Sequence, residues 1–263
     1  MKLDYATLLC PNPIKLSIGS LIKHTLREIA EISFDKFNLY EAFLKITPEQ
    51  YYMKFKGNDG KKYWESLSEE TKDQLTIYKL ISTDDAINRI YIEILNFFFK
   101  EYVAFKDGYF ILFNQEVDIN RDVPQDSICG VINEETFSQV LSLIQQICCI
   151  YEEEEAIDSL SFKNSLARKL YEKMLKAQKK EKEQKKYDKN HSIPNIISAV
   201  SNCHPTINPV NVWDLTLFQL LDSFNRLRVN KMYDIDARRV SVWGDSKKTF
   251  NAALWYKNEF DKS

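Results

Sequence analysis

The sequence predicts a mainly α-helical protein of the α+β class, with a helical-bundle-like core and one small β-hairpin. Glycine and proline, the residues on which many-turned all-β folds depend, are scarce, with 6 and 7 in 263 residues. Apolar side chains recur at the 3.6-residue spacing of helices along much of the chain. With 44% hydrophobic residues, the chain can bury a sizeable core in one large domain or two smaller ones.

Residues 1–160 are expected to form an acidic, mostly helical domain. Pro11 and Pro13 favour an extended start, and helical spacing begins at Ser20. Pro48 follows Thr47 and is expected at the first position of another helix. Further helices are expected over residues 35–46 and 68–81, with a turn at residues 57–60.

A helix is predicted to begin at Thr83, whose hydroxyl would cap it, with Asp84 and Asp85 near the positive end of the helix dipole. One face of this helix is apolar, at residues 87, 90, 91, 94, 95 and 98. Two apolar runs around Gly108 predict a β-hairpin at residues 102–113, which a short strand at 127–132 is expected to join. Asn133 is expected to cap the next helix.

Beyond residue 160 the composition changes. Residues 161–190 are predicted to form a basic helical arm or linker, rich in strong helix formers and with little apolar face after residue 176. Residues 191–263 are predicted to form a C-terminal helical module, with helices near 194–200, 214–229 and 248–260.

Charge is unevenly distributed between the two parts. Residues 1–160 hold 16 Lys and Arg against 27 Asp and Glu, whereas residues 161–263 hold 20 against 11. Such asymmetry is typical of a region that faces nucleic acid or a membrane. It is equally compatible with two parts that attract one another, with faces that meet different subunits, or with a solvated surface.

The basic tract of residues 163–189 carries 11 Lys and Arg against 4 Asp and Glu. A row of cations suits phosphate, but repetitive lysines do not read base edges, and Tyr171 and Tyr187 are too few for a single-strand stacking platform. A solvated helix is the main interpretation, and nucleic-acid binding is the alternative hypothesis. That alternative would use six lysines, namely Lys176, Lys179, Lys180, Lys182, Lys185 and Lys186.

Motifs of catalysis, metal binding and membrane insertion are missing from the sequence. There is no Gly-x-Ser-x-Gly elbow, and the neighbouring Cys203 and His204 lack the spacing of a zinc site. His24 is interpreted as a surface residue. No apolar run reaches the roughly 18 residues that span a bilayer, and the start lacks a signal-peptide pattern. We therefore expect a non-enzymatic cytosolic protein with reduced cysteines, no cofactor and no membrane partner.

The apolar helix expected at residues 214–229 has an apolar stripe wider than a small module can cover. Leu217, Leu221 and Phe224 share one face and are predicted to be core anchors. The wider stripe is either core of the whole fold or an interface with another protein, because large aromatic residues dominate interface energetics. In the second case the partner-binding residues would be Trp213, Phe218, Leu220, Trp243 and Trp255.

The C-terminal block also carries a family resemblance. The run from Val212 to Leu220, the Phe224-Asn225-Arg226-Leu227 stretch and the later Trp243-Gly244 and Leu254-Trp255-Tyr256 resemble the C-terminal portions of tail-assembly proteins in contractile-tailed phages of low-GC bacteria. The resemblance covers roughly the last 50 residues. It implies a tail-assembly chaperone or a baseplate or hub component, with tape-measure, hub or tube proteins as partners. Its expected location is the host cytoplasm, with the virion as a second location.

Overall fold

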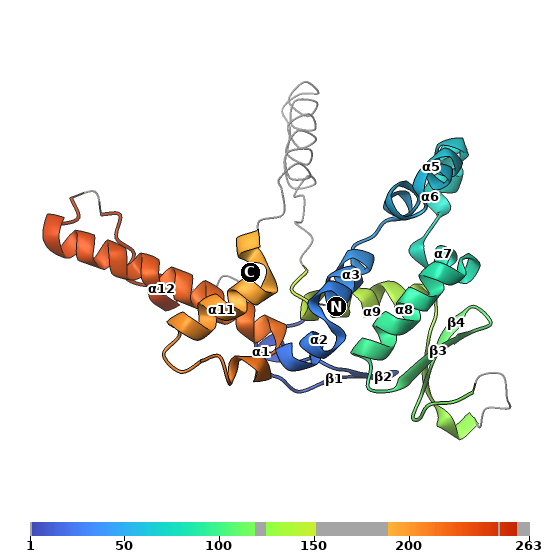
Figure 1. Ribbon diagram of the computed structural model, residues 1–263, viewed down its shortest axis with the longest axis horizontal. Helices are drawn as coiled ribbons and strands as arrows, with labels where there is room; N and C mark the ends of the chain where they lie inside the picture. Colours follow the sequence, from blue (N-terminus) through green and yellow to red (C-terminus); the bar gives the residue numbers. More distant parts are fainter. Residues whose placement is uncertain (1, 119–124, 151–188, 247, 257–263) are drawn as a thin grey trace.

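The computed structural model describes residues 2–118, 125–150, 189–246 and 248–256, and Figure 1 shows its arrangement. The described chain is mainly helical with two small antiparallel sheets, so the predicted α+β class is confirmed. Helices α3 (Phe34–Leu44), α8 (Asp85–Phe98) and α9 (Glu134–Ile147) lie in the middle of the body (Figure 1). Helices α5 (Gly57–Ser66) and α6 (Glu69–Gln74) extend from one end, and α12 (Leu217–Trp243) extends from the other. Among the described helices, none is long and apolar enough to cross a membrane.

The expectation of an extended N-terminus is correct only in part. Asp4 caps a short helix by accepting a hydrogen bond from the Thr7 amide at 2.7 Å. The helix predicted from Ser20 begins six residues later, because Ser20 is paired in a strand and the capping box of Thr25 and Glu28 starts the helix there. The elements are α1 (Tyr5–Leu9), β1 (Ile14–Leu16), β2 (Gly19–Leu21) and α2 (Leu26–Ile32).

Residues 57–60 are not a turn, and that prediction is wrong. They form the first turn of α5, which packs on a π-helical segment immediately before it. A Cβ at Gly60 would lie 2.6 Å from the Tyr52 carbonyl oxygen, so this glycine permits close packing rather than chain reversal. Pro48 opens a helix as predicted. The elements are α3 (Phe34–Leu44), α4 (Pro48–Gln50), η1 (Tyr51–Phe55) and α5 (Gly57–Ser66).

The helix predicted over residues 68–81 is two helices, α6 (Glu69–Gln74) and α7 (Ile77–Thr83). Leu75 is extended, and Thr76 starts the second helix by accepting from the Lys79 amide. The next helix, α8 (Asp85–Phe98), has the predicted buried face but a different cap. Asp84 accepts from the Ala86 amide, whereas Thr83 ends α7.

The predicted hairpin and its third strand are confirmed. Strands β3 (Tyr102–Lys106), β4 (Tyr109–Phe113) and β5 (Ile128–Ile132) form an antiparallel sheet in that order. Asp107 and Gly108 make the tight turn with φ values of 52° and 83°. Asn133 caps α9 (Glu134–Ile147) by accepting from the Thr136 amide, as expected.

The C-terminal helices enter the same hydrophobic core as the N-terminal elements. Leu220 of α12 (Leu217–Trp243) and Val200 of α11 (Ile193–Cys203) belong to one buried cluster with Leu26 and Phe98. The Leu26 amide also donates to the Leu215 carbonyl at 2.8 Å. The arm predicted at residues 161–190 lies outside the described residues up to residue 188.

The predicted limits of the last two helices need correction. The helix expected to end near residue 229 continues to Trp243. The helix predicted from residue 248 does not form in the described residues, which hold only the 3-10 turn η5 (Leu254–Tyr256). The Asp245 carboxylate accepts from the amides of Thr249 and Phe250 instead, and this turn replaces a helical start.

Candidate protein-binding interface

Helix α12 is the longest described element, at 27 residues and about 40 Å. Thr216 and Gln219 form a capping box at its start. At its end Gly244 adopts a φ of 71° and donates its amide to the Val240 carbonyl at 2.8 Å. The helix therefore has a defined beginning and end, which sequence periodicity alone did not locate.

The proximal half of α12 is anchored in the body. Leu217, Phe218 and Leu220 are buried, and Leu221 and Phe224 pack partly buried against the same core. This placement agrees with the prediction that Leu217, Leu221 and Phe224 serve as core anchors.

The segment that follows α12 contacts one side of the helix. The rings of Tyr233 and Phe250 lie 5.6 Å apart, and the Arg226 guanidinium donates to the Tyr256 carbonyl at 3.2 Å. The backbone amides of Phe250 and Thr249 lower the pKa of Asp245 below its ordinary value, because their hydrogen bonds favour the carboxylate. The chain beyond α12 thus folds back along the helix and leaves another side open.

That open side carries four large, exposed apolar residues. Met232, Ile235, Val242 and Trp243 expose 52, 67, 70 and 83% of their surface. On a regular helix these four side chains fall within an arc of about 100°. Together with Arg239, which lies inside the same arc, they are called here the distal face.

The distal face continues the buried face of the proximal half. About five full helical turns separate Leu217 from Ile235, and the same interval separates Phe224 from Val242, so each pair points in one direction. The body covers the first member of each pair more than the second. One side of α12 is therefore core at its start and an exposed apolar surface at its end.

Two of the predicted partner-binding residues must be reassigned. Phe218 and Leu220 expose 2% and 0% of their surface, so they are core residues and do not present a surface to a partner. Trp213 is half-buried and donates its indole N–H to the Pro209 carbonyl at 3.1 Å. Trp243 and Trp255 are exposed, but Trp255 lies in η5 rather than on α12.

The lysines of the nucleic-acid alternative all lie outside the described residues. The Cys203 and His204 pair is placed, and it serves local structure. His204 Nδ1 accepts from the amides of Thr206 and Ile207, and the Lys231 amine lies 3.5 Å from the Cys203 sulfur. Among the described residues, no group of three or more His, Cys, Asp or Glu side chains is placed to hold a metal ion.

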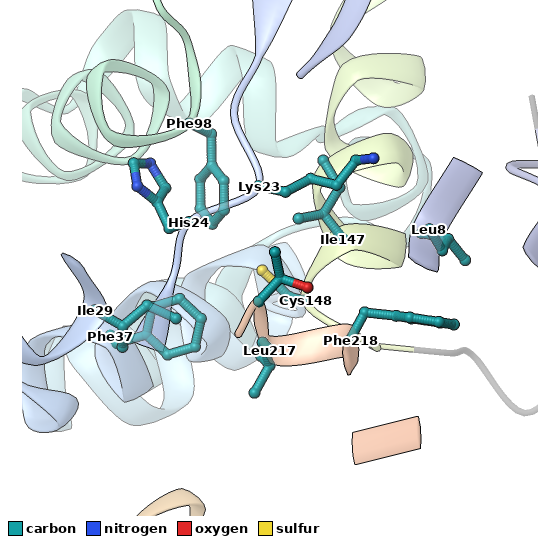
Figure 2. Close-up of a pocket in the computed structure, with 11 residues that line it drawn as sticks. Leu8, Lys23, His24, Ile29, Phe37, Phe98, Ile147, Cys148, Leu217 and Phe218 are labelled. Carbon is teal, nitrogen blue, oxygen red and sulfur yellow. The ribbon is translucent and has the colours of Figure 1, made fainter. Parts of the chain in front are cut away.

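A small cavity of about 10 Å³ lies where α1, α9 and α12 meet, next to Lys23 and His24 (Figure 2). The Lys23 amine donates to the carbonyls of Thr7 and Cys10, and burial lowers its pKa. His24 is not the surface residue expected from its neighbours, because its ring stacks on Phe97 with centroids 3.9 Å apart. The cavity has room for about one water molecule and is a packing feature.

A larger cavity of about 230 Å³ lies between α3, the end of α9, α11 and α12. Its lining includes Glu41, Lys45, Cys149, His191 and Leu221. Burial raises the pKa of Glu41, and the nearby Lys45 opposes that shift. These side chains come from four separate segments, so no local sequence pattern indicates that they meet.

Glu41→Gln is expected to make the protein more stable near neutral pH. The pKa of Glu41 is raised above the ordinary value of 4.5, so the native state binds this proton more tightly than the unfolded chain does. Its ionisation therefore destabilises the fold above the native pKa, and this effect vanishes below the unfolded pKa. Thermal melts should show a higher Tm for the variant at neutral pH and a smaller difference near about pH 4. Glu31→Gln on the exposed surface of α2 controls for loss of charge; a difference that grows towards acid pH would contradict the expectation.

Comparison with protein-family models gives a match that contains the distal face. Residues 179–259 match the family model of the YomV second domain. No curated protein and no solved structure matches the chain. The matched segment includes α11, α12 and the chain that folds back along α12. The domain that defines this family is phage-derived. The match therefore supports a phage origin for this chain.

Proposed function

We propose that this chain is a non-enzymatic protein of phage tail morphogenesis, a tail-assembly chaperone or a baseplate or hub component, which binds another tail protein through the distal face of α12. The tape-measure, hub and tube proteins are the candidate partners. The host cytoplasm is the place of action during assembly, and retention in the virion is the second location.

The exposed apolar surface of the distal face carries the proposal. Single exposed apolar residues are common on proteins, whereas four large ones along one side of one helix, with Arg239 between them, mark a candidate binding surface. Trp and Met are enriched where proteins meet, and a tryptophan at the centre of an interface is often a hot spot. Trp243 exposes 83% of its surface, against 54% for Trp255.

Two further observations support a role in phage assembly. The segment matched by the phage-derived domain model includes the whole of α12. The tail-assembly resemblance rests on residues of the same helix and of the segment that folds back along it. The proposed interface, the matched domain and the resemblance therefore coincide in one part of the chain.

Ile235→Asp should weaken partner binding while leaving the fold intact. Ile235 is 67% exposed, so the substitution should change the free energy of unfolding by no more than about 0.5 kcal/mol. A carboxylate in the middle of a buried contact should cost about 2 kcal/mol of binding, roughly a 30-fold loss of affinity. Tagged protein from phage-producing cells should then lose its tail proteins in quantitative mass spectrometry, and the yield of tailed particles should fall.

Tyr109→Asp is the matched control, because Tyr109 is an exposed aromatic residue, at 49%, on the distant β3–β4 hairpin. This variant should retain tail proteins and particle yield. Normal capture of tail proteins and normal tail assembly by an Ile235→Asp/Trp243→Ala double variant would overturn the proposed function.

A further inference from the structure

We infer that the partner element which docks on the distal face is an α-helix of a different protein, with an apolar seam bordered by Asp and Glu side chains. The inference rests on the proposed function and adds the shape and charge of the binding partner. It follows from the spacing of the distal face, from the cations along its border and from the way the face would meet a second copy of itself.

The spacing of the distal face suits a helix. Met232, Ile235, Arg239 and Val242 follow one another at intervals of three and four residues, which is the seam pattern of paired helices. Such a seam is narrow, and the helix that carries it is regular from Leu217 to Trp243. A second helix lying along it would place its own side chains between these four.

One border of the seam is basic. Lys231 and Arg238 are exposed and lie next to Ile235 and Val242 around the helix. Within the seam, the Arg239 guanidinium is held 3.2 Å from the Asp236 carboxylate. Asp236 lies on the opposite side of the seam, and Asp234 is the one acidic residue next to the basic border. Lys231 and Arg238 together outweigh it and give this border a net positive charge. A partner helix with carboxylates along its facing edge would complement this charge.

The same cations disfavour a second copy of this chain as the occupant. In an antiparallel pair, each border of the seam faces the same border of the other copy, so Lys231 and Arg238 would meet their equivalents. In a parallel pair, Arg239 would meet Arg239 within the seam. Like charges at such positions oppose association in either orientation.

Three designed peptides test the inference on the full-length protein. Each is an amphipathic helix of about three heptads. The first has a Leu and Ile seam bordered by Glu, the second has the same seam bordered by Lys, and the third has Glu borders and a Ser seam. Fluorescence anisotropy of labelled peptide, titrated with protein, gives the affinities at low salt and at about 0.3 M salt.

The Glu-bordered peptide should bind at least about tenfold more tightly than the Lys-bordered peptide at low salt. The ratio of the two affinities should decrease at high salt. The Ser-seam peptide should not bind. Lys231→Glu/Arg238→Glu should reverse the preference between the first two peptides. Lys54→Glu/Lys62→Glu, which changes two exposed lysines at the other end of the body, should leave it unchanged.

Equal affinity for the Glu-bordered and Lys-bordered peptides, or no binding of either, would overturn the inference. The proposed function would survive that result if Ile235→Asp still removed tail proteins in cells. A dimer in sedimentation equilibrium that Ile235→Asp dissociates would make a second copy the occupant and overturn the inference. Tighter binding of an oligothymidylate, abolished by Lys231→Glu/Arg238→Glu, would also overturn it and assign the border to nucleic acid.

Discussion

Phe218→Ala should lower the free energy of unfolding by about 3–5 kcal/mol, the range for a buried aromatic residue cut to alanine. Phe218 is 2% exposed, and its ring meets Tyr5 edge-on with centroids 5.8 Å apart. It also borders the small cavity near Lys23 (Figure 2), so its removal would enlarge a space that the packed core around it can close only in part. Urea unfolding followed by circular dichroism measures the change.

Trp243→Ala is the control for Phe218→Ala on the same helix. Trp243 exposes 83% of its surface, so its loss should alter the free energy of unfolding by no more than about 0.5 kcal/mol. Comparison of the two variants distinguishes a core residue of α12 from an exposed interface residue of the same helix. A Phe218→Ala protein that kept its stability but lost its partner would restore Phe218 to the partner surface and contradict the buried placement.

Gly130→Ala should destabilise the protein by about 1–3 kcal/mol, the cost of forcing extra volume into a closely packed contact. A Cβ at Gly130 would lie 2.4 Å from the Ile18 carbonyl oxygen and 2.6 Å from the Ile18 Cα. Because these are backbone atoms, the turn between β1 and β2 would have to move away from β5. Thermal melts should show a clear drop in Tm.

Cys129→Ala changes the preceding residue of β5, which is exposed, and it should leave the Tm nearly unchanged. Equal Tm values for Gly130→Ala and Cys129→Ala would mean that the turn between β1 and β2 does not rest on β5 as described.

The sequence predicted most elements where the signal was local. Asn133 and Thr47 carry their own capping partners three residues later, and Gly108 supplies the positive φ that the hairpin turn requires. The failures involve distant contacts. The sequence around Gly60 predicts a turn. In the structure this glycine instead allows α5 to pack closely against the Tyr52 backbone, a contact that depends on the fold.

The candidate interface could be predicted in part. Trp243 is one of the predicted partner-binding residues and lies on the distal face, whereas Met232, Ile235 and Val242 are not among those predicted. The sequence predicts that this helix ends near residue 229, so the prediction does not place these three residues on one helix. Their spacing of three and seven residues nevertheless fits one side of a helix. Local sequence patterns do not predict the burial of Phe218 and Leu220, because residues from the N-terminal part of the chain pack over them.

The continuous geometry of α12 has a consequence for the thermodynamics of association. A recognition segment that folds only on binding loses backbone entropy at that moment, at about 1–2 kcal/mol for each residue that becomes ordered. The distal face belongs to a helix whose first turns are already fixed in the core, so most of that ordering has taken place before any encounter. Preorganisation of this kind lets a short apolar seam reach useful affinity with a modest contact area.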